Sequence, residues 1–295
     1  MAEGDIPVLL AQGKSLAEAW EDSLLKLYRH GCDVRTEYDR LGPDGAYLDP
    51  PSKDATMIVV VQDPASEPLI HRAFPGGPAD LEEYRQEVCD GIKDHWIRDP
   101  ANPDDSRWEY TYHERLFAYS APGVPRPVNQ IDSLVEKLAG APHTRRAQAI
   151  TWKPWIDLDC VDPPCLQSMW FRLLEHGAGW RLNMNVRFRS RDAYDAAFMN
   201  IYAFISLQQS LADVLSRRLS RPVSLGRYVD MSDSYHIYGS RLAHFENMFL
   251  AQLGKRSFEE RTWTRADVAD VLAEAKPQIA EKVRCVDARS RRPGC

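Results

Sequence analysis

The sequence predicts an α+β fold with a mixed or antiparallel sheet. Stretches with helical periodicity dominate the first half of the chain, whereas three strand-like stretches follow one another between residues 147 and 190. These strands do not alternate with helices, as the strands of a doubly wound parallel sheet would. A long apolar helical stretch comes directly after them. Strands and helices are therefore expected in separate runs around one sheet.

Length and charge limit the possible functions. The 295 residues are enough for one large domain or two smaller ones, and 44% of them are hydrophobic, so a sizeable core can form. The net charge of −6 gives no overall attraction for nucleic acid or for anionic lipid. An anionic small substrate would therefore need arginines gathered at one place.

Nothing in the sequence suggests export or membrane insertion. The N-terminal MAEGDIPVLLAQGKS lacks the basic start and the long apolar core of a signal peptide. No run of about 18 apolar residues predicts a membrane-spanning helix. The six cysteines are sparse and irregularly spaced, which is typical of reduced thiols. We expect a cytoplasmic protein with neither nucleic acid nor membrane as its partner.

Local signals place the elements of the first half. Residues 15–31 have an amphipathic helical pattern, with Ser15 and Glu18 spaced as a capping box and Gly31 as the stop. The further elements expected are a turn-rich loop at 40–54, a buried strand at 57–63, helices at 80–96 and 131–140, and a polar loop with prolines at 97–106.

In the second half, strands are expected at 147–153, 165–171 and 182–190. The last one alternates between an apolar and a polar face. The apolar face carries Leu182, Met184, Val186 and Phe188, and the polar face carries Asn183, Asn185, Arg187 and Arg189. Residues 193–219 are apolar nearly all round, which is typical of a core helix. A last amphipathic helix is expected at 265–283, interrupted by Pro277.

Cys165, in the stretch DPPCLQSMW at 162–170, allows three interpretations. Free cysteine is often a buried space-filling residue. A zinc ligand is disfavoured, because Cys160 is too distant for a C-x2-C start and no second Cys/His pair follows, so we expect no metal. A nucleophile would need a nearby cation to lower a thiol pKa of about 8.5. Arg145, Arg146 and Arg189 are candidates, since guanidinium groups also suit phosphate.

Four motifs in order resemble the thymidylate synthase family. That family has an arginine pair, a tryptophan six residues later, Pro-Cys thirteen residues after that, then R-S-x-D, an asparagine eight residues on, and H-x-Y. Here Arg146 to Trp152 is six residues, Trp152 to Cys165 is thirteen, and Asp192 to Asn200 is eight. The matching stretches are RRAQAITW with PPC, RFRSRD, FMN and YHIY, within about residues 145–245.

The resemblance implies a thymidylate synthase-like three-layer fold, a single domain over residues 1–295, with a large mixed sheet forming the interface of a homodimer. It also implies a pyrimidine nucleotide as substrate and 5,10-methylenetetrahydrofolate as one-carbon donor. Cys165 would attack C6 of the base. Arg189 and Ser190 would bind the 5′-phosphate, which Arg145 and Arg146 would reach from the other subunit.

Further roles follow from the same resemblance. Asp192 would position base and cofactor, Asn200 would bind the base edge, and His236 and Tyr238 would bind a sugar hydroxyl. The N-terminal third matches only loosely. The remaining candidates are Glu87, or else Glu83, as general base, Tyr112 as an active-site tyrosine, and Arg35, or else Arg40, as a mobile phosphate-loop arginine. Each glutamate could instead be a solvated charge on an acidic helix.

Departures from the methylating enzymes point to hydroxymethylation. Leu166 stands where the methylating enzymes have a histidine after the nucleophile, and Ser234 stands where they have an aspartate before x-H-x-Y. Their L-G-x-P-F-N is replaced by DAAFMN at 195–200. The C-terminal RSRRPGC lacks their closing segment. Deoxycytidylate hydroxymethylases of phages resemble this chain at the first two of these positions. They carry Asp where this chain has Asn200.

The base and the sugar stay open at this point. The amide of Asn200 can pair with uracil or, rotated, with cytosine. Lys153 and Ala196 resemble the CMP 5-hydroxymethylases of mildiomycin-type antibiotic biosynthesis. We therefore predict a CMP 5-hydroxymethylase that forms a Cys165–C6 adduct and adds water to give 5-hydroxymethyl-CMP. Methylation of dUMP is the first alternative, and a catalytically silent nucleotide-binding homologue is the second.

Overall fold

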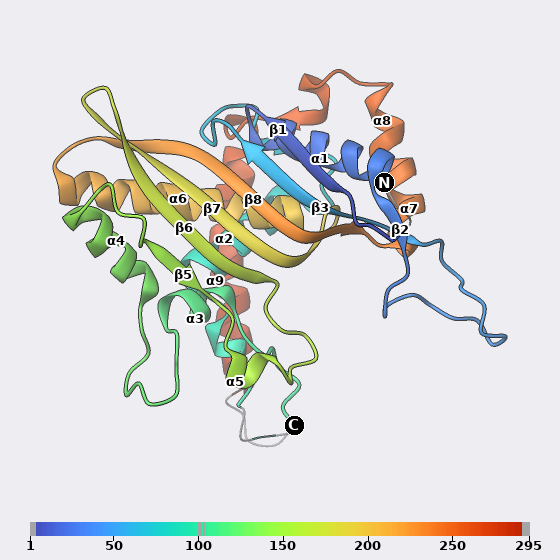
Figure 1. Ribbon diagram of the computed structural model, residues 1–295, viewed down its shortest axis with the longest axis horizontal. Coiled ribbons are helices and arrows are strands. Elements are labelled where there is room, and N and C mark those ends of the chain that lie inside the picture. The colour runs from blue at the N-terminus through green and yellow to red at the C-terminus, as the bar shows by residue number, and fades with distance from the viewer. Residues whose placement is uncertain (1–3, 100–101, 103, 291–295) are drawn as a thin grey trace. The chain divides into compact units, whose positions relative to one another are not determined.

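The computed structural model describes residues 4–99, 102 and 104–290, with side chains up to residue 284. The expected loop at 97–106 and the C-terminal RSRRPGC lie partly outside the described residues. Seven strands form the main sheet, in the order β1-β3-β8-β7-β6-β5 with β2 also on β3, and β4 pairs with β9 (Figure 1). The strands are β1 (Val8–Gly13), β2 (Cys32–Val34), β3 (Ser52–Val61), β4 (Ile70–His71), β5 (Gln148–Ile150), β6 (Leu166–His176), β7 (Gly179–Asp192), β8 (Val223–Ile237) and β9 (Thr262–Trp263).

The predicted α+β class and mixed sheet are confirmed. β1 runs parallel to β3, whereas β2 and β8 run antiparallel to β3, and β5 runs antiparallel to β6. The helices of at least six residues are α1 (Leu16–His30), α2 (Pro78–Asp90), α3 (Tyr112–Phe117), α4 (Gln130–Gly140), α6 (Ala197–Leu219), α7 (Gly239–Phe245) and α9 (Ala269–Ser290).

Helix α1 begins and ends where the sequence predicts. The Ser15 hydroxyl accepts from the Glu18 amide and the Glu18 carboxylate accepts from the Ser15 amide, which is the predicted capping box. Gly31 ends the helix with an extended backbone rather than a left-handed one. A Cβ there would lie 2.6 Å from the Leu27 carbonyl oxygen, so the glycine provides space for a close approach.

The chain forms two compact units that interleave in sequence. Unit 1 comprises Met1–Pro75, Met184–Ile201 and Leu225–Ala266, and unit 2 comprises Gly76–Asn183, Tyr202–Ser224 and Asp267–Cys295. Each unit has its own buried core. Whether both belong to a single domain, as predicted, stays a prediction.

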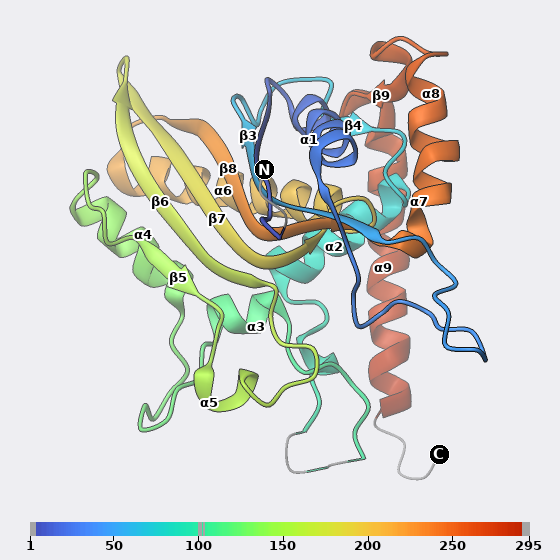
Figure 2. The same cartoon turned by 45° about the vertical axis from the view of Figure 1, so that its right-hand side comes forward.

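The core of unit 1 is built around Trp20 of α1. This helix lies against β1 and β3 (Figures 1 and 2). The fully buried Trp20 ring contacts Tyr194, Phe198 and Phe249, with centroids 5.1–6.4 Å apart. Its indole N–H donates to the Ala193 carbonyl at 2.9 Å. Because Ala193 directly follows β7, this bond fixes the end of the strand that carries Arg189 and Asp192.

In unit 2, α2 packs against α9, and α4 packs against β5 and β6 (Figure 2). A buried ion pair joins α3 to the short helix α5 (Pro154–Asp157). Arg115 donates to the two Asp157 carboxylate oxygens at 2.9 and 2.8 Å, and both side chains are nearly inaccessible. Because water does not reach these buried charges, each one is compensated by the other. The ion pair therefore fixes the segment that precedes Cys165 to α3.

Some boundaries differ from the predictions. α2 ends at Asp90, because Gly91 adopts a left-handed φ of 67°, and only the 3-10 turn Asp94–Trp96 follows. α6 begins four residues later than expected, after a turn at 193–196. The prediction that Pro277 interrupts the last helix is wrong. Proline removes one backbone hydrogen bond, and the 22-residue α9, packed on α2, continues through it.

Sequence patterns missed β1 and β8. In β8 the buried positions include Asp230 and Ser232, so the apolar alternation of a half-buried strand is broken. Asp230 accepts from Arg191 at 2.5 Å and from Ser232 at 3.1 Å, which satisfies its buried charge. Within the described ranges, no helix has both the length and the apolar character needed to cross a membrane.

Candidate active site

One pocket in unit 2 contains two of the predicted catalytic residues. We call it the tyrosine pocket; it opens to solvent and encloses about 820 Å³. It is lined by Glu87, Arg107, Trp108, Glu109, Tyr110, Thr111, Tyr112 and Asp162. Glu87 projects from α2 and Tyr112 from the first turn of α3. The helix ends therefore bring together two residues that are 25 positions apart in the sequence.

Cys165 lies beside this pocket, in the bend directly before β6. Its side chain is half-buried. The Tyr112 hydroxyl accepts from the Leu166 amide at 3.4 Å, so the phenol lies against the backbone next to the cysteine. Burial raises the pKa of Tyr110, and negative charge on Tyr112, Cys165 and Asp162 would act in the same direction. The thiol, the two phenols and a carboxylate therefore form one cluster.

The backbone around Cys165 is held on both sides. Thr151 donates its hydroxyl to the Leu166 carbonyl and its amide to the Gln167 carbonyl. The side-chain amide of Gln167 donates from Nε2 to the Pro164 carbonyl at 2.8 Å. Leu166 itself is fully buried. The leucine that replaces the expected histidine therefore packs in the core and fixes the start of β6.

Of the two candidate glutamates, Glu87 has the environment that suits proton transfer. Burial raises its pKa, and Lys93, whose Nζ lies 3.0 Å from Glu87 Oε2, opposes that rise. Glu83 also meets Lys93, at 2.9 Å, and it meets Lys282 of α9 at 2.9 Å. Burial acts to raise the pKa of Glu83, but these two bonds leave it lowered.

Sequence reasoning missed Lys93. It follows Glu87 by six residues, a spacing that does not share a face of a continuous helix. The left-handed Gly91 ends α2 and turns the chain, which allows Lys93 to fold back onto both glutamates. The glycine in CDGIKD was the one available signal, because Gly in a helical pattern often marks its C-terminal cap.

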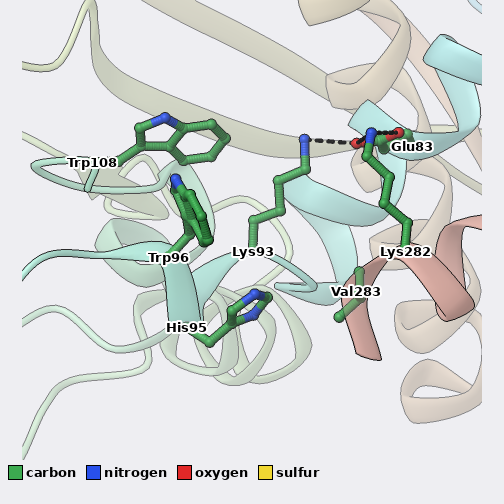
Figure 3. A pocket seen from close by; sticks show the side chains of 7 residues that line it. All are labelled: Glu83, Lys93, His95, Trp96, Trp108, Lys282 and Val283. Atoms are coloured by element: carbon green, nitrogen blue, oxygen red, sulfur yellow. Dashed lines mark hydrogen bonds and ion pairs between the residues drawn. The ribbon is translucent and has the colours of Figure 1, made fainter. Parts of the chain in front are cut away.

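A second cavity of unit 2, the tryptophan pocket, encloses about 530 Å³. Its lining consists of Glu83, Lys93, His95, Trp96, Trp108, Lys282 and Val283 (Figure 3). The Trp96 and Trp108 indoles lie together, while Lys93 and Lys282 both reach Glu83. Trp108 lines both cavities, so they adjoin. Flat aromatic walls line this cavity, and its two lysines are both paired with Glu83.

The remaining predicted residues gather at the ends of β7 and β8 in unit 1. Arg189, Ser190 and Asp192 close β7, and His236 lies at the end of β8. The Ala193 amide donates to the His236 carbonyl at 2.7 Å and joins the two strand ends. In β7, the predicted division into a buried apolar face and a more exposed polar face is confirmed.

Asp192 caps the turn that leads into α6. Its Oδ1 accepts from the amides of Tyr194 and Asp195, at 3.0 and 2.8 Å. Burial raises its pKa to about 6 despite these two bonds. Ala196 and Asn200 follow in this turn and the start of α6, where the Asn200 amide donates to the Ala196 carbonyl at 3.1 Å.

His236 is 5% exposed, and burial lowers its pKa to about 4, so the imidazole is neutral near pH 7. Its ring contacts Tyr238 at 4.5 Å between centroids, and Tyr238 contacts Tyr38 at 5.7 Å. The loop after β2 therefore reaches the sugar-binding pair predicted from the sequence. In that loop Arg35 lies over the Tyr47 ring at 3.8 Å.

Both candidate loop arginines are engaged by carboxylates. Arg35 contacts Asp39 at 3.2 Å and donates to the Asp49 carbonyl at 2.8 Å. Arg40 binds both oxygens of Asp49, at 2.8 and 2.6 Å. The Asp49 pKa is lowered by the bond to Arg40. A phosphate would therefore have to exchange with these carboxylates before either arginine could bind it.

Three predicted residues lie apart from these clusters. Arg145 and Arg146 are exposed just before β5, with the Trp170 indole donating to the Arg145 carbonyl at 3.0 Å. Lys153 is buried in unit 2, where its Nζ lies 2.8 Å from Glu114 and 3.0 Å from Ser120. Burial lowers the Lys153 pKa. The other site residues thus form one group in each unit, with Arg145, Arg146 and Lys153 outside both.

Comparison with known proteins gives this geometry its context. A protein from Methanocaldococcus jannaschii, provisionally named a thymidylate synthase, is 29% identical over 79% of this chain and 92% of its own length. A protein with the same provisional name from Methanothermobacter marburgensis is 31% identical over 76% of this chain and 90% of its own. Thymidylate synthase of Bacillus subtilis subsp. natto is 29% identical over 48% of this chain and 47% of its own.

The fold has a solved counterpart. The thermostable thymidylate synthase A from Bacillus subtilis superimposes with a TM-score of 0.58 over 79% of this chain and 83% of its own, at 17% sequence identity. The predicted thymidylate synthase-like fold is therefore confirmed. The sequence profile named "Thymidylate synthase" matches residues 80–269, which include Glu87, Cys165 and His236. On this match the chain belongs to the thymidylate synthase family of one-carbon transferases.

Proposed function

We propose that this protein is a CMP 5-hydroxymethylase that uses 5,10-methylenetetrahydrofolate. The observation that carries the proposal is the cluster in unit 2, where Cys165 lies beside the pocket lined by Glu87 and Tyr112. A thiol nucleophile next to a proton-transfer group is what covalent activation of a pyrimidine ring requires. The names of the relatives support one-carbon transfer to a pyrimidine.

Cys165 would act as the nucleophile toward the pyrimidine ring. Its Sγ bonds to C6 of the base, and the electron pair of the C5–C6 double bond moves to C5. The folate supplies one carbon at the oxidation level of formaldehyde. After C5 has bonded to that carbon and lost its proton, the bond between that carbon and the folate nitrogen would break, with its electron pair going to the nitrogen, which would take up a proton as tetrahydrofolate leaves. An exocyclic methylene would then remain on the nucleotide. The oxygen of water bonds to that methylene, the C6–S bond breaks, and 5-hydroxymethyl-CMP and tetrahydrofolate are the products.

Glu87 and Tyr112 are the proton-transfer groups in this proposal. A carboxyl whose pKa is raised by burial can exchange protons closer to neutral pH than a solvated one. Lys93 holds Glu87 in place and limits the rise. Tyr112, which already accepts a bond from the Leu166 amide, would stabilise the segment that carries the nucleophile. The tryptophan pocket would take the planar ring of the folate.

Phosphate binding and dimerisation are proposed together. Arg189 and Ser190 would bind the 5′-phosphate, and the exposed Arg145 and Arg146 would reach it from a second subunit. The outer face of the sheet in unit 1 supports a homodimer, because large apolar side chains are exposed on it. These are Val8 at 72%, Leu10 at 53% and Met231 at 37%. A partner subunit would cover them.

Asp192, Asn200, His236 and Tyr238 would bind the base and the sugar, with Arg35 or Arg40 at the phosphate. Lys153 and Ala196 support the assignment to CMP only through the resemblance. The buried Leu166 supports hydroxymethylation, because no imidazole follows the nucleophile. The alternative, methylation of dUMP, is favoured by Asn200 and by the names of the relatives.

A panel of CMP, dCMP, UMP and dUMP with methylenetetrahydrofolate tests the proposal by mass spectrometry. The expected product is CMP heavier by one CH₂O unit. A product heavier by CH₂ alone would replace hydroxymethylation with methylation. If none of the four nucleotides gives a product, the proposal fails and the second alternative, a catalytically silent nucleotide-binding homologue, takes its place. The variants Cys165→Ser and Cys160→Ser form a matched pair, in which only the first should abolish turnover.

A further inference from the structure

Two polar side chains, Ser234 and Asp54, lie in sequence behind the imidazole of His236 in the core of unit 1. The Ser234 hydroxyl is 2.8 Å from Asp54 Oδ2 and 3.2 Å from His236 Nδ1. Asp54 is 9% exposed and His236 is 5% exposed. Neither Asp54 nor Ser234 belongs to the set of residues predicted from the sequence to bind substrate. The mechanism proposed above does not use either of them.

The strand register explains how the three residues meet. Asp54 of β3 lies directly opposite His236 of β8, and the register shifts between the pairs Ala55–Tyr235 and Met57–Ser232. One extra residue of β8 is therefore accommodated at 233–234, and Thr56 binds the Asp233 carbonyl at 2.9 Å. Such bulges redirect side chains beside functional sites. Here the bulge lies at Ser234, whose side chain points toward Asp54.

The direction of the hydrogen bonds follows from the number of protons. Ser234 has one hydroxyl proton, and a carboxylate can only accept, so this proton is donated to Asp54. The Ser234 oxygen can then only accept from His236. The Nδ1 atom of His236 must carry the hydrogen, because the neutral ring has one N–H. The Nε2 atom is therefore an acceptor, and it is buried without a hydrogen-bond partner among the described residues.

We propose that Asp54 and Ser234 are positioning residues that fix the Nδ1–H tautomer of His236, so that its buried Nε2 accepts a hydrogen bond from a hydroxyl group of the ligand. A substrate without that hydroxyl would leave Nε2 unsatisfied. The assignment of the hydroxyl to the sugar of a nucleotide rests on the proposed function. The tautomer itself does not, since it depends only on groups within unit 1.

Nitrogen NMR of the free protein labelled with ¹⁵N-histidine tests the tautomer without any substrate. The His236 signals are identified with the His236→Gln variant. In the wild-type protein near pH 7, Nδ1 should be protonated and Nε2 unprotonated. Ser234→Ala removes the hydroxyl that accepts from Nδ1 and leaves only the hydrogen bond between the ring and the Ser234 backbone, so the Nε2–H form should appear beside the Nδ1–H form. Ser232→Ala is the matched control, because this buried serine on the same strand binds Asp230 instead.

Two results would overturn the proposal: a proton on Nε2 in the wild-type protein, or an unchanged tautomer in Ser234→Ala. Circular dichroism of both serine variants shows whether they fold. Asp54→Ala gives an independent variant, in which Ser234 no longer has a carboxylate to bind and the mixture of tautomers should also appear.

Kinetics then test the ligand hydroxyl. Ser234→Ala should lower kcat/KM for CMP by about 5- to 10-fold, as expected for one neutral hydrogen bond, and 3′-deoxy-CMP should lose little by the same substitution. An equal loss for both nucleotides would refute the hydroxyl assignment. If none of the four nucleotides reacts, the proposed function fails, yet the NMR result still decides the tautomer.

Discussion

Replacing Lys93 tests whether Glu87 is the general base of unit 2. In the variant Lys93→Met, the cation 3.0 Å from Glu87 is replaced by an apolar side chain of similar length. The Glu87 pKa is already raised by burial, and Lys93 is the largest influence that lowers it. Removing Lys93 therefore raises the Glu87 pKa further. The carboxylate form, which a general base requires, then needs a higher pH.

The size of the effect follows from the contact. An opposite charge within about 4–6 Å typically lowers a carboxyl pKa by about 1–3 units. Lys93 is 25% exposed and is shared with Glu83, so the lower half of that range applies. We expect the Glu87 pKa to rise by about 1 to 1.5, equivalent to about 1.4–2 kcal/mol. The acid limb of the kcat/KM profile should move to higher pH by the same amount.

The assay is product formation from CMP across the pH range, supported by carboxyl ¹³C NMR titration of Glu87, which needs no turnover. Lys282→Met is the matched control, because Lys282 pairs with Glu83 and is 64% exposed. Its profile should move by only a few tenths of a unit. An acid limb that stays in place in Lys93→Met, or that moves equally in both variants, would refute the assignment of Glu87 as the base.

Three further predictions concern the nucleophile and stability. Cys165→Ser should lower turnover by at least about 1,000-fold, measured by mass spectrometry, while Cys160→Ser keeps it and thermal unfolding of both stays near wild type. Asp157→Ala should lower the free energy of unfolding in urea by about 3 kcal/mol, because it removes the two-point partner of the buried Arg115 and leaves it the 3.3 Å ion pair with Glu114; a loss below about 1 kcal/mol would contradict this. The Asp192 pKa is raised to about 6 in the folded protein, so its ionisation destabilises the fold as pH rises from about 4 to 6. Asp192→Asn should match wild type at pH 4 and exceed its unfolding free energy by up to about 3 kcal/mol at pH 8; no gain at pH 8 would show that the buried charge costs nothing.

The local sequence determined the elements whose signals are contained within a few residues. The capping box of Ser15 and Glu18 fixed the start of α1, and the alternation from Leu182 to Phe188 identified the buried face of β7. Motif spacing was enough to indicate the family, because the distances from Trp152 to Cys165 and from Asp192 to Asn200 equal those of the thymidylate synthase pattern. These features depend on hydrogen bonds and periodicity over short separations.

The tertiary structure decided what depends on contacts between distant segments. β8 escaped prediction because Asp230 is buried there and is neutralised by Arg191, which comes from another strand. Lys93 reaches Glu87 only because Gly91 turns the chain back after α2. The link from Asp54 to His236 spans 182 positions and exists only through the register of β3 and β8.

The candidate nucleophile, Cys165, shows the same division. The distance of Cys165 from Trp152 in the sequence indicated a reactive thiol, yet all residues that line the pocket beside it, except Asp162, come from segments 53 to 78 positions away. The meaning of Leu166 also changed: it is fully buried at the start of β6, with its carbonyl held by Thr151. Sequence alone named Glu87, Tyr112 and Cys165, whereas their protonation and support depend on burial and long-range contacts, such as that of Lys93 with Glu87, which no local pattern encodes.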